Sequence, residues 1–179
     1  MGRIVVSQFL TLDGVMEAPE KWNTAYLNDE ELVNELLADL NACDAILMGR
    51  TTYEFFASRW PLRAGAMADY FNTLPKYVVS ASLQKAAWNN SVIINDYVVE
   101  EIKKLKERSG KNILLFGSYK LFETLSTTHL IDEYKLYIYP LTLCTGKRLF
   151  EPGATGQTLK LIASQFFATG VIALTYQPL

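Results

Sequence analysis

The sequence contains very little cysteine and histidine. Two cysteines, Cys43 and Cys144, and one histidine, His129, occur among 179 residues. Neither cysteine lies in a paired motif such as C-x-x-C, so the sequence gives no sign of a zinc or iron site and excludes a histidine-rich one. Two isolated cysteines fit a reducing compartment. We therefore expect a cytoplasmic protein without a bound metal.

Long apolar runs and basic clusters are also missing. No apolar stretch approaches the ~20 residues needed to cross a bilayer, and no basic segment followed by an apolar one marks a signal peptide. The formal net charge is −2, and no stripe of Lys and Arg is present. We therefore expect neither a membrane nor a nucleic acid as partner.

Apolar residues, by contrast, are abundant. Half of the residues are hydrophobic and 20% are charged, which suits a domain with a substantial core. The sequence shows no repeat, linker or low-complexity segment. We expect residues 1–179 to form a single domain.

The most informative segment is an apolar run, residues 45–48, that ends at Gly49 and continues into Arg50, Thr51 and Thr52. A strand that passes directly into a helix leaves unpaired N–H groups and the positive end of the helix dipole at one place. Such a corner favours a phosphate group, and an arginine fork adds a matching cation. The alternative is an ordinary strand–helix corner with a solvated arginine.

Two further strand ends have the same character. One apolar run ends at Gly117 and Ser118, and another, residues 77–79, runs into Ser80 and the small residues after it. Ligands of open α/β sheets collect at the carboxyl ends of strands, so three such ends suit an extended dinucleotide. Neither a Walker loop nor G-x-G-x-x-G is present.

Periodicity predicts the secondary structure. Strands are expected at 3–10, 45–48, 76–80, 92–95, 113–116, 133–143, 158–167 and 171–176. Helices are expected from a cap at Asn28 or Asp29 to about residue 41, from 51, at 66–74, from a cap at Asp96 to 108, and at 119–126. Alternating strands and helices imply parallel crossovers, and the final pair implies a hairpin. The prediction is a three-layer α/β fold with a mixed, mostly parallel sheet, helices on both faces and an antiparallel C-terminal hairpin.

Several short motifs occur in a fixed order along nearly the whole chain. They are residues 11–14 (Thr-Leu-Asp-Gly), 48–54 (Met-Gly-Arg-Thr-Thr-Tyr-Glu), 117–121, 130–134, 139–141 and 146–150. This ordered set resembles the dihydrofolate reductase-like superfamily. The likeness is closer to the reductase domain of riboflavin-biosynthesis deaminase-reductases and its stand-alone relatives.

The resemblance implies an NADPH-dependent reductase of a small heterocyclic or ribosylaminopyrimidine-type substrate. It assigns cofactor contacts, from pyrophosphate and 2′-phosphate through adenosine to nicotinamide, to Gly49, Arg50, Thr51, Thr52, Ser80, Ala81, Ser82, Gly117, Ser118, Tyr119, Lys120 and Leu121. The expected preference for NADPH over NADH depends chiefly on Arg50.

Two positions depart from the family pattern. Ser118 stands where relatives usually carry a second glycine, and Cys144 stands where they often have glycine. A serine with positive φ costs about 1 kcal/mol; alternatively, its hydroxyl replaces a backbone contact to phosphate. Ser118 also keeps open a second interpretation, a non-enzymatic nucleotide-binding module with a degraded catalytic centre.

The substrate side is assigned to Asp13, Trp22 and Trp60. Relatives that reduce folate hold the pterin with an acidic residue on the first helix, but the corresponding position here is Val33. Dihydrofolate reduction is therefore the less favoured alternative. The resemblance places Asp13 near substrate and nicotinamide, as the candidate catalytic proton donor, although a turn aspartate bonded to its own backbone is the ordinary alternative. The two tryptophans would stack on a flat ring, unless they are simply core residues.

The last expectation concerns assembly. The aromatic strand that contains Tyr134, Tyr137 and Tyr139, together with the apolar terminal hairpin, offers more apolar surface than one sheet face needs. We expect a homodimer built on this region, as is common in the resembling family, with two-fold symmetry.

Overall fold

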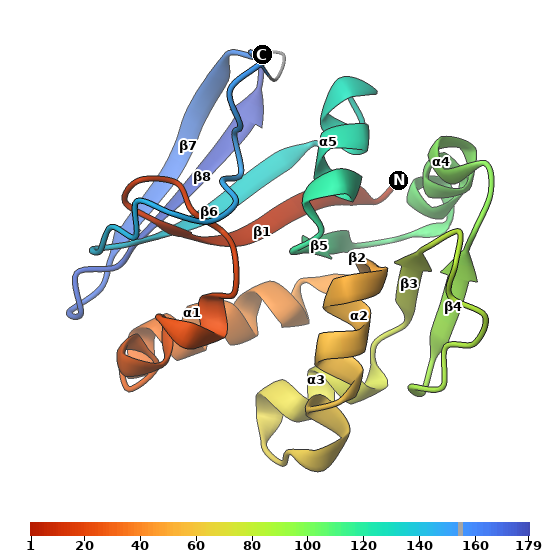
Figure 1. Ribbon diagram of the computed structural model, residues 1–179, viewed down its shortest axis with the longest axis horizontal. Helices are drawn as coiled ribbons and strands as arrows, with labels where there is room; N and C mark the ends of the chain where they lie inside the picture. The colour runs from red at the N-terminus through yellow and green to blue at the C-terminus, as the bar shows by residue number, and fades with distance from the viewer. Residues whose placement is uncertain (154–155) are drawn as a thin grey trace.

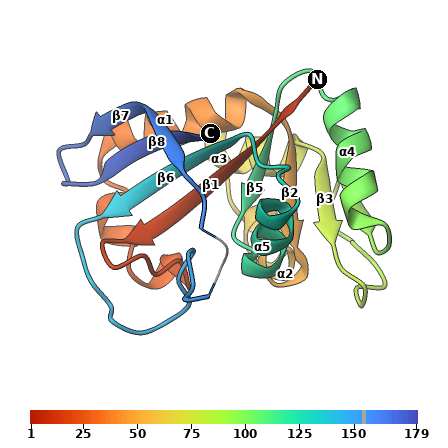
Figure 2. The same ribbon diagram turned by 90° about the horizontal axis from the view of Figure 1, so that it is seen from above.

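The computed structural model describes residues 1–153 and 156–179, and it is organised around one eight-stranded sheet (Figure 1). The strands are β1 (Arg3–Thr11), β2 (Cys43–Gly49), β3 (Lys76–Val79), β4 (Ser91–Ile94), β5 (Asn112–Phe116), β6 (Glu133–Tyr139), β7 (Leu159–Phe166) and β8 (Ile172–Pro178). Their order in the sheet is β4-β3-β2-β5-β1-β6-β8-β7, and the view from above in Figure 2 shows it from β3 to β7. The first six strands in this order are parallel, and β8 runs antiparallel to β6 and β7.

Five α-helices cover the two faces of the sheet. They are α1 (Glu30–Asn41), α2 (Arg50–Ala57), α3 (Ala66–Thr73), α4 (Val98–Arg108) and α5 (Tyr119–Thr127). Helices α1, α2 and α3 lie on one face, and α4 and α5 lie on the other (Figure 1). Short 3-10 turns at Pro19–Lys21, Thr24–Tyr26 and Trp60–Leu62 were not predicted. The predicted fold class, a mixed sheet between two helical layers with a C-terminal hairpin, is confirmed.

The central strands are apolar because both of their faces are covered. In β1, Ile4 and Val6 belong to the core beneath α4 and α5, whereas Val5 packs in the core beneath α2 and α3. Alternate side chains of a strand point to opposite faces. A strand buried on both faces therefore needs a nearly continuous apolar run.

Two details of the predicted elements can be compared with the structure. Asp29 caps α1 by accepting the N–H of Leu32 at 3.2 Å, as predicted. The prediction of Asp96 as a cap was wrong, because the N-cap of α4 is Tyr97, in the left-handed region at φ 49°, and no side chain caps this helix. Strand β6 ends at Tyr139 rather than at residue 143, since Pro140 has no N–H for the ladder.

The aromatic side chains of β6 are part of the protein's own core. Tyr134, Tyr137 and Tyr139 are all fully buried, so the prediction that this strand has surplus apolar surface was wrong. Exposed apolar surface remains on the edge strand β7, where Leu161, Ile162 and Phe166 are 49%, 43% and 71% exposed.

Chain topology selects one end of the sheet as the place for a ligand. Strand β2 is followed by α2 and leads to β3 on one side, whereas its neighbour β5 is followed by α5 and leads past β1 to β6. Adjacent parallel strands whose connections leave in opposite directions form a crevice at their carboxyl ends.

Within the described residues, no helix has the length and apolarity needed to span a membrane.

Candidate functional site

The two glycine corners recognised in the sequence lie together at this crevice. Strands β2 and β5 pair in parallel, with Leu47 opposite Leu115, so Gly49 and Gly117 follow at the same level. Neither α2 nor α5 has a side-chain cap. The first-turn N–H groups and the positive ends of two helix dipoles therefore converge on one place, which suits an anion.

Ser118 links the two corners. Its Oγ accepts a hydrogen bond from the N–H of Gly49 at 2.5 Å and lies 3.1 Å from Oγ1 of Thr52. The residue has φ 60° and ψ 63°, so the serine adopts the left-handed conformation that favours glycine. The hydroxyl therefore uses its hydrogen-bonding capacity on β2 and α2, which helps to offset the backbone strain.

The backbone conformation and the close packing at position 117 both require glycine. Its φ is +55°, and a Cβ atom added to it would lie 2.6 Å from Oγ1 of Thr52. Its carbonyl accepts a hydrogen bond from Nε2 of Gln8 at 3.0 Å. Residues 3–10 were predicted only as a strand, but a glutamine within an apolar run was a usable signal for a polar contact.

Arg50 is held by two partners. Its Nε donates to Oε1 of Glu54 at 2.7 Å, and its Nη1 donates to Oγ of Ser82 at 2.9 Å. The structure thus brings together Arg50 and Ser82, two of the predicted cofactor residues from different strand ends. Glu54 was given no role in the sequence analysis, although its position four residues after Arg50 on a helix indicates an ion pair.

The third strand end is a tight turn after β3. Oγ of Ser80 accepts the N–H groups of Ser82 at 3.2 Å and Leu83 at 3.0 Å. Ser80 is buried, whereas Ala81 and Ser82 are exposed. The Ser80 hydroxyl therefore shapes the turn, and the exposed residues are the ones available to a ligand.

The remaining predicted cofactor residues differ in access. Thr51 and Lys120 are exposed and Tyr119 is half-buried. Leu121 is only 5% exposed and packs in the core beneath α4 and α5. The side chain of Leu121 is therefore a core residue, and only its N–H, in the first turn of α5, faces the crevice end of the helix.

Asp13 has a different environment from the one its predicted role requires. Its carboxylate accepts hydrogen bonds from Oγ1 of Thr11 at 2.6 Å, from the N–H of Cys144 at 2.8 Å and from the N–H of Leu143 at 3.2 Å. The Thr11 bond, with these two N–H groups, lowers the pKa of Asp13 to about 2. The carboxyl group is thus ionised at neutral pH, which argues against its use as a proton donor and favours the alternative of a structural loop aspartate.

Asp13 belongs to a contact between two loops. Nε of Arg148 donates to the carbonyl of Asp13 at 2.9 Å, and Oε2 of Glu17 accepts the N–H of Lys147 at 3.1 Å. Cys144 has φ 59°, so the second departure from glycine also occupies a left-handed position. Residues 11–17 and 143–148 are therefore held together as one unit beside the end of β1.

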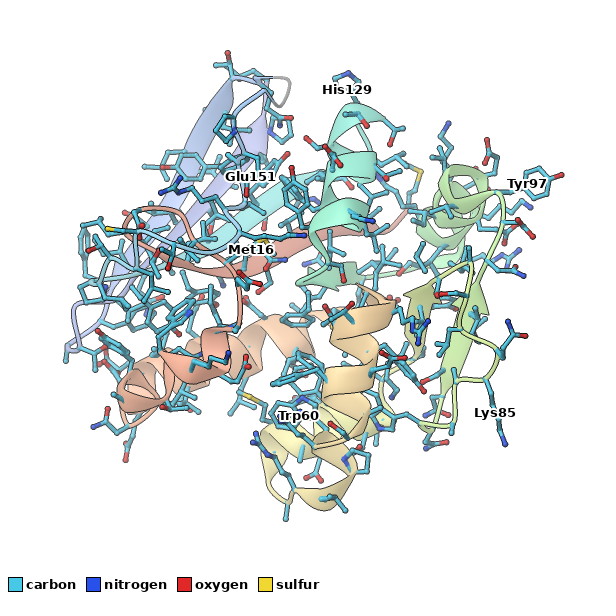
Figure 3. The ribbon with its side chains drawn as sticks, in the orientation of Figure 1. Met16, Trp60, Lys85, Tyr97, His129 and Glu151 are labelled. Atoms are coloured by element: carbon cyan, nitrogen blue, oxygen red, sulfur yellow. The ribbon has the colours of Figure 1, made fainter. Side chains whose placement is uncertain are left out.

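The two predicted substrate tryptophans lie in separate aromatic clusters. Trp22 meets Tyr139 edge-to-face at 5.2 Å and donates from Nε1 to the carbonyl of Glu17 at 3.0 Å. Trp60 stacks on Phe71 at 4.4 Å, and Phe71 in turn contacts Phe116 at 5.6 Å. Figure 3 shows Trp60 beside α3, on the side of the sheet opposite Met16. The Trp60 cluster approaches the crevice through Phe116, which directly precedes Gly117.

No carboxylate stands at the predicted pterin position. Val33 occupies it and is half-buried. Both oxygens of the nearby Asp29 carboxylate already accept hydrogen bonds within the protein. Oδ1 accepts the N–H of Leu32, and Oδ2 accepts the N–H and the hydroxyl of Thr169 at 3.1 and 3.0 Å. Although burial works in the opposite direction, these bonds and the N–H of Leu32 lower the pKa of Asp29.

Known proteins resemble this chain over nearly its whole length. The model of the RibD C-terminal domain family matches residues 3–173. The uncharacterized protein YyaP of Bacillus subtilis (strain 168) is 30% identical in an alignment 179 positions long that covers 97% of this chain and 94% of YyaP.

Two solved structures share the fold at low identity. The diaminohydroxyphosphoribosylaminopyrimidine deaminase/5-amino-6-(5-phosphoribosylamino)uracil reductase of Thermotoga maritima has a TM-score of 0.69 and 16% identity, covering 99% of this chain and 57% of that one. Dihydrofolate reductase of Enterococcus faecalis, complexed with NADP(H), has a TM-score of 0.66 and 15% identity, covering 99% of this chain and 96% of that one.

The link made by Ser118 predicts two different effects of mutation. Ser118→Ala removes the acceptor for the Gly49 N–H but keeps the strained backbone, and we expect a loss of about 1–2 kcal/mol in the free energy of unfolding. Ser118→Gly also removes the hydroxyl but relieves about 1 kcal/mol of left-handed strain, so its loss should be smaller. Urea denaturation measures the free energy of unfolding of both variants, and equal stability of Ser118→Ala and the native protein would show that the hydroxyl contributes nothing.

The lowered pKa of Asp13 predicts a pH-dependent contribution to stability. Its folded pKa of about 2 lies below the ordinary value of 3.8, so the stabilisation is present above pH 3.8 and is lost as the pH falls towards 2. Asp13→Asn should therefore be less stable than the native protein at pH 7, and the difference should narrow below pH 4. Urea denaturation at several pH values tests this, and a difference that does not change with pH would contradict it.

Proposed function

This chain belongs to the RibD C-terminal domain family, and from that membership we propose that it is an NADPH-dependent reductase of a small heterocyclic or ribosylaminopyrimidine-type substrate. The observation that carries the proposal is the crevice between β2 and β5. Two uncapped helix N-termini meet there, with Arg50 on the first turn of one of them.

The residues at the crevice fit a dinucleotide phosphate. Pyrophosphate would lie against the first-turn N–H groups of α2 and α5, where two helix dipoles share its charge. Gly117, which has no room for a Cβ atom beside Thr52, keeps the two corners in contact. Ala81 and Ser82 lie at the end of β3, which the Arg50 side chain reaches, and the adenosine 2′-phosphate would be held there.

The chain's own contribution to the reaction is mainly positional. When bound, NADPH supplies the hydride. Gly117 follows the aromatic cluster of Phe116, Phe71 and Trp60, which gives the crevice an apolar wall on the side of α2 and α3. Such a wall suits a flat heterocycle and excludes water from it. Asp13, ionised and bonded to Leu143 and Cys144, would hold the adjoining loops in place beside the substrate.

Two alternative functions are less favoured, dihydrofolate reduction and nucleotide binding without catalysis. Dihydrofolate reduction would need a carboxylate on the first helix to hold the pterin. Val33 occupies that position, and the nearby Asp29 is hydrogen-bonded to Leu32 and Thr169. A nucleotide-binding module without activity would have the same strand–helix corners at Gly49 and Gly117, so the structure of these corners does not separate it from an enzyme. Oxidation of bound NADPH by candidate substrates separates such a module from an enzyme.

Cofactor titration tests the central proposal. We expect NADPH to bind more tightly than NADH, and Arg50→Ala to lose most of that preference, because a charge-assisted contact is worth about 1.5–3 kcal/mol. Quenching of tryptophan fluorescence measures both dissociation constants. Arg59→Ala is the matched control, since Arg59 lies just after α2 and stacks on Phe55 at 3.7 Å. Equal affinity of the native protein for both cofactors would contradict the assignment of Arg50.

We also propose a homodimer, now placed on the edge strand β7 rather than on β6. This strand ends the sheet and exposes Leu161, Ile162 and Phe166. An apolar edge of this kind is normally covered, and pairing with a second copy is a two-fold solution. Sedimentation equilibrium at micromolar concentration should give twice the 20.2 kDa mass of the chain. Phe166→Asp should shift it towards the monomer, and a native monomer would overturn the proposal.

A further inference from the structure

Arg50 and Glu54 form an ion pair beside the turn after β3, where the proposed function puts the adenosine ribose. Both side chains are on α2, four residues apart, with 48% and 49% of their surface exposed. The Arg50 side chain extends from α2 to the turn after β3, where it meets Ser82. The pair is therefore beside the third strand end and open to solvent, where it can meet a ligand.

Arg50 keeps most of its binding capacity in this arrangement. A guanidinium group has five N–H donors, of which one bonds to Glu54 and one to Ser82. The other three have no partner among residues 1–153 and 156–179 and are left for a ligand. A 2′-phosphate could therefore reach Arg50 without breaking the bond to Glu54.

Glu54 changes the electrostatics of that contact. An ionised carboxylate only accepts hydrogen bonds, and it repels a phosphate dianion placed on the same guanidinium. A ribose 2′-hydroxyl, in contrast, can donate to a carboxylate, which is the chemistry by which acidic residues select NAD over NADP in other dinucleotide sites. Arg50 and Glu54 thus favour opposite cofactors from adjacent positions.

We propose that Glu54 is a specificity-determining residue that limits the preference for NADPH and lets the same site accept NADH. The proposal rests on the proposed function. Glu54 would accept the 2′-hydroxyl of NADH, whereas Arg50 would bind the 2′-phosphate of NADPH. The choice between the cofactors is then a balance of two charges rather than the property of one arginine.

The test is the ratio of the two dissociation constants in Glu54→Gln. Glutamine keeps the size of the side chain and an acceptor for Arg50 but removes the negative charge. We expect the ratio of the NADH to the NADPH dissociation constant to rise about fivefold, chiefly through tighter NADPH binding. Because the charges are exposed, the increase should shrink towards 1 M salt, which a purely structural effect of the substitution would not do.

Glu101→Gln is the matched control. Glu101 forms a similar exposed pair with Lys104, at 2.6 Å on α4, and the variant has the same change in net charge. It should leave the ratio unchanged. An unchanged ratio in Glu54→Gln, or an equal rise in Glu101→Gln, would overturn the role of Glu54 while the proposed function stands. A native protein that binds neither cofactor would overturn both proposals.

Discussion

The parallel pairing of β2 with β5 is the constraint on which the rest of the site depends. These strands are far apart in the sequence. Strand β2 ends at Gly49 just before α2, and Gly117 follows β5 and precedes Ser118, the N-cap of α5. Because α2 and α5 leave the sheet in opposite directions, neither of these two helices crosses above the carboxyl ends of the strands. Two helix N-termini therefore face the same open space. The cofactor contacts that we propose lie at the ends of these two strands and at the adjoining end of β3.

The cost of bringing the corners together is met by specific contacts. Gly117 and Ser118 both have left-handed backbones, an arrangement that disfavours side chains. Gln8 fixes the carbonyl of Gly117, and the Ser118 hydroxyl joins Gly49 to Thr52. The strained segment is thus tied to β1, β2 and α2, and the serine that departs from the family pattern has a structural use.

The carboxylates near the site act through their charge and their hydrogen bonds rather than as acids. Asp13 ties together two loops, Asp29 caps α1 and holds the hairpin turn, and Glu54 balances Arg50. The nearby wall formed by Phe116, Phe71 and Trp60 is apolar. Ionised carboxylates beside an apolar wall suit hydride transfer, because this reaction depends on the orientation of the reactants and the exclusion of water more than on a strong acid or base.

The sequence by itself determined the local features of this protein. The strand–glycine–helix corners, the cap at Asp29 and the terminal hairpin all depend on residues a few positions apart, and the structure has each of them. Tertiary structure alone decided which distant groups meet: Ser118 with Gly49, Asp13 with Cys144, and the burial of Tyr134, Tyr137 and Tyr139. Those contacts depend on strand order and register, which are fixed by packing across the whole sheet and are not encoded in any short segment.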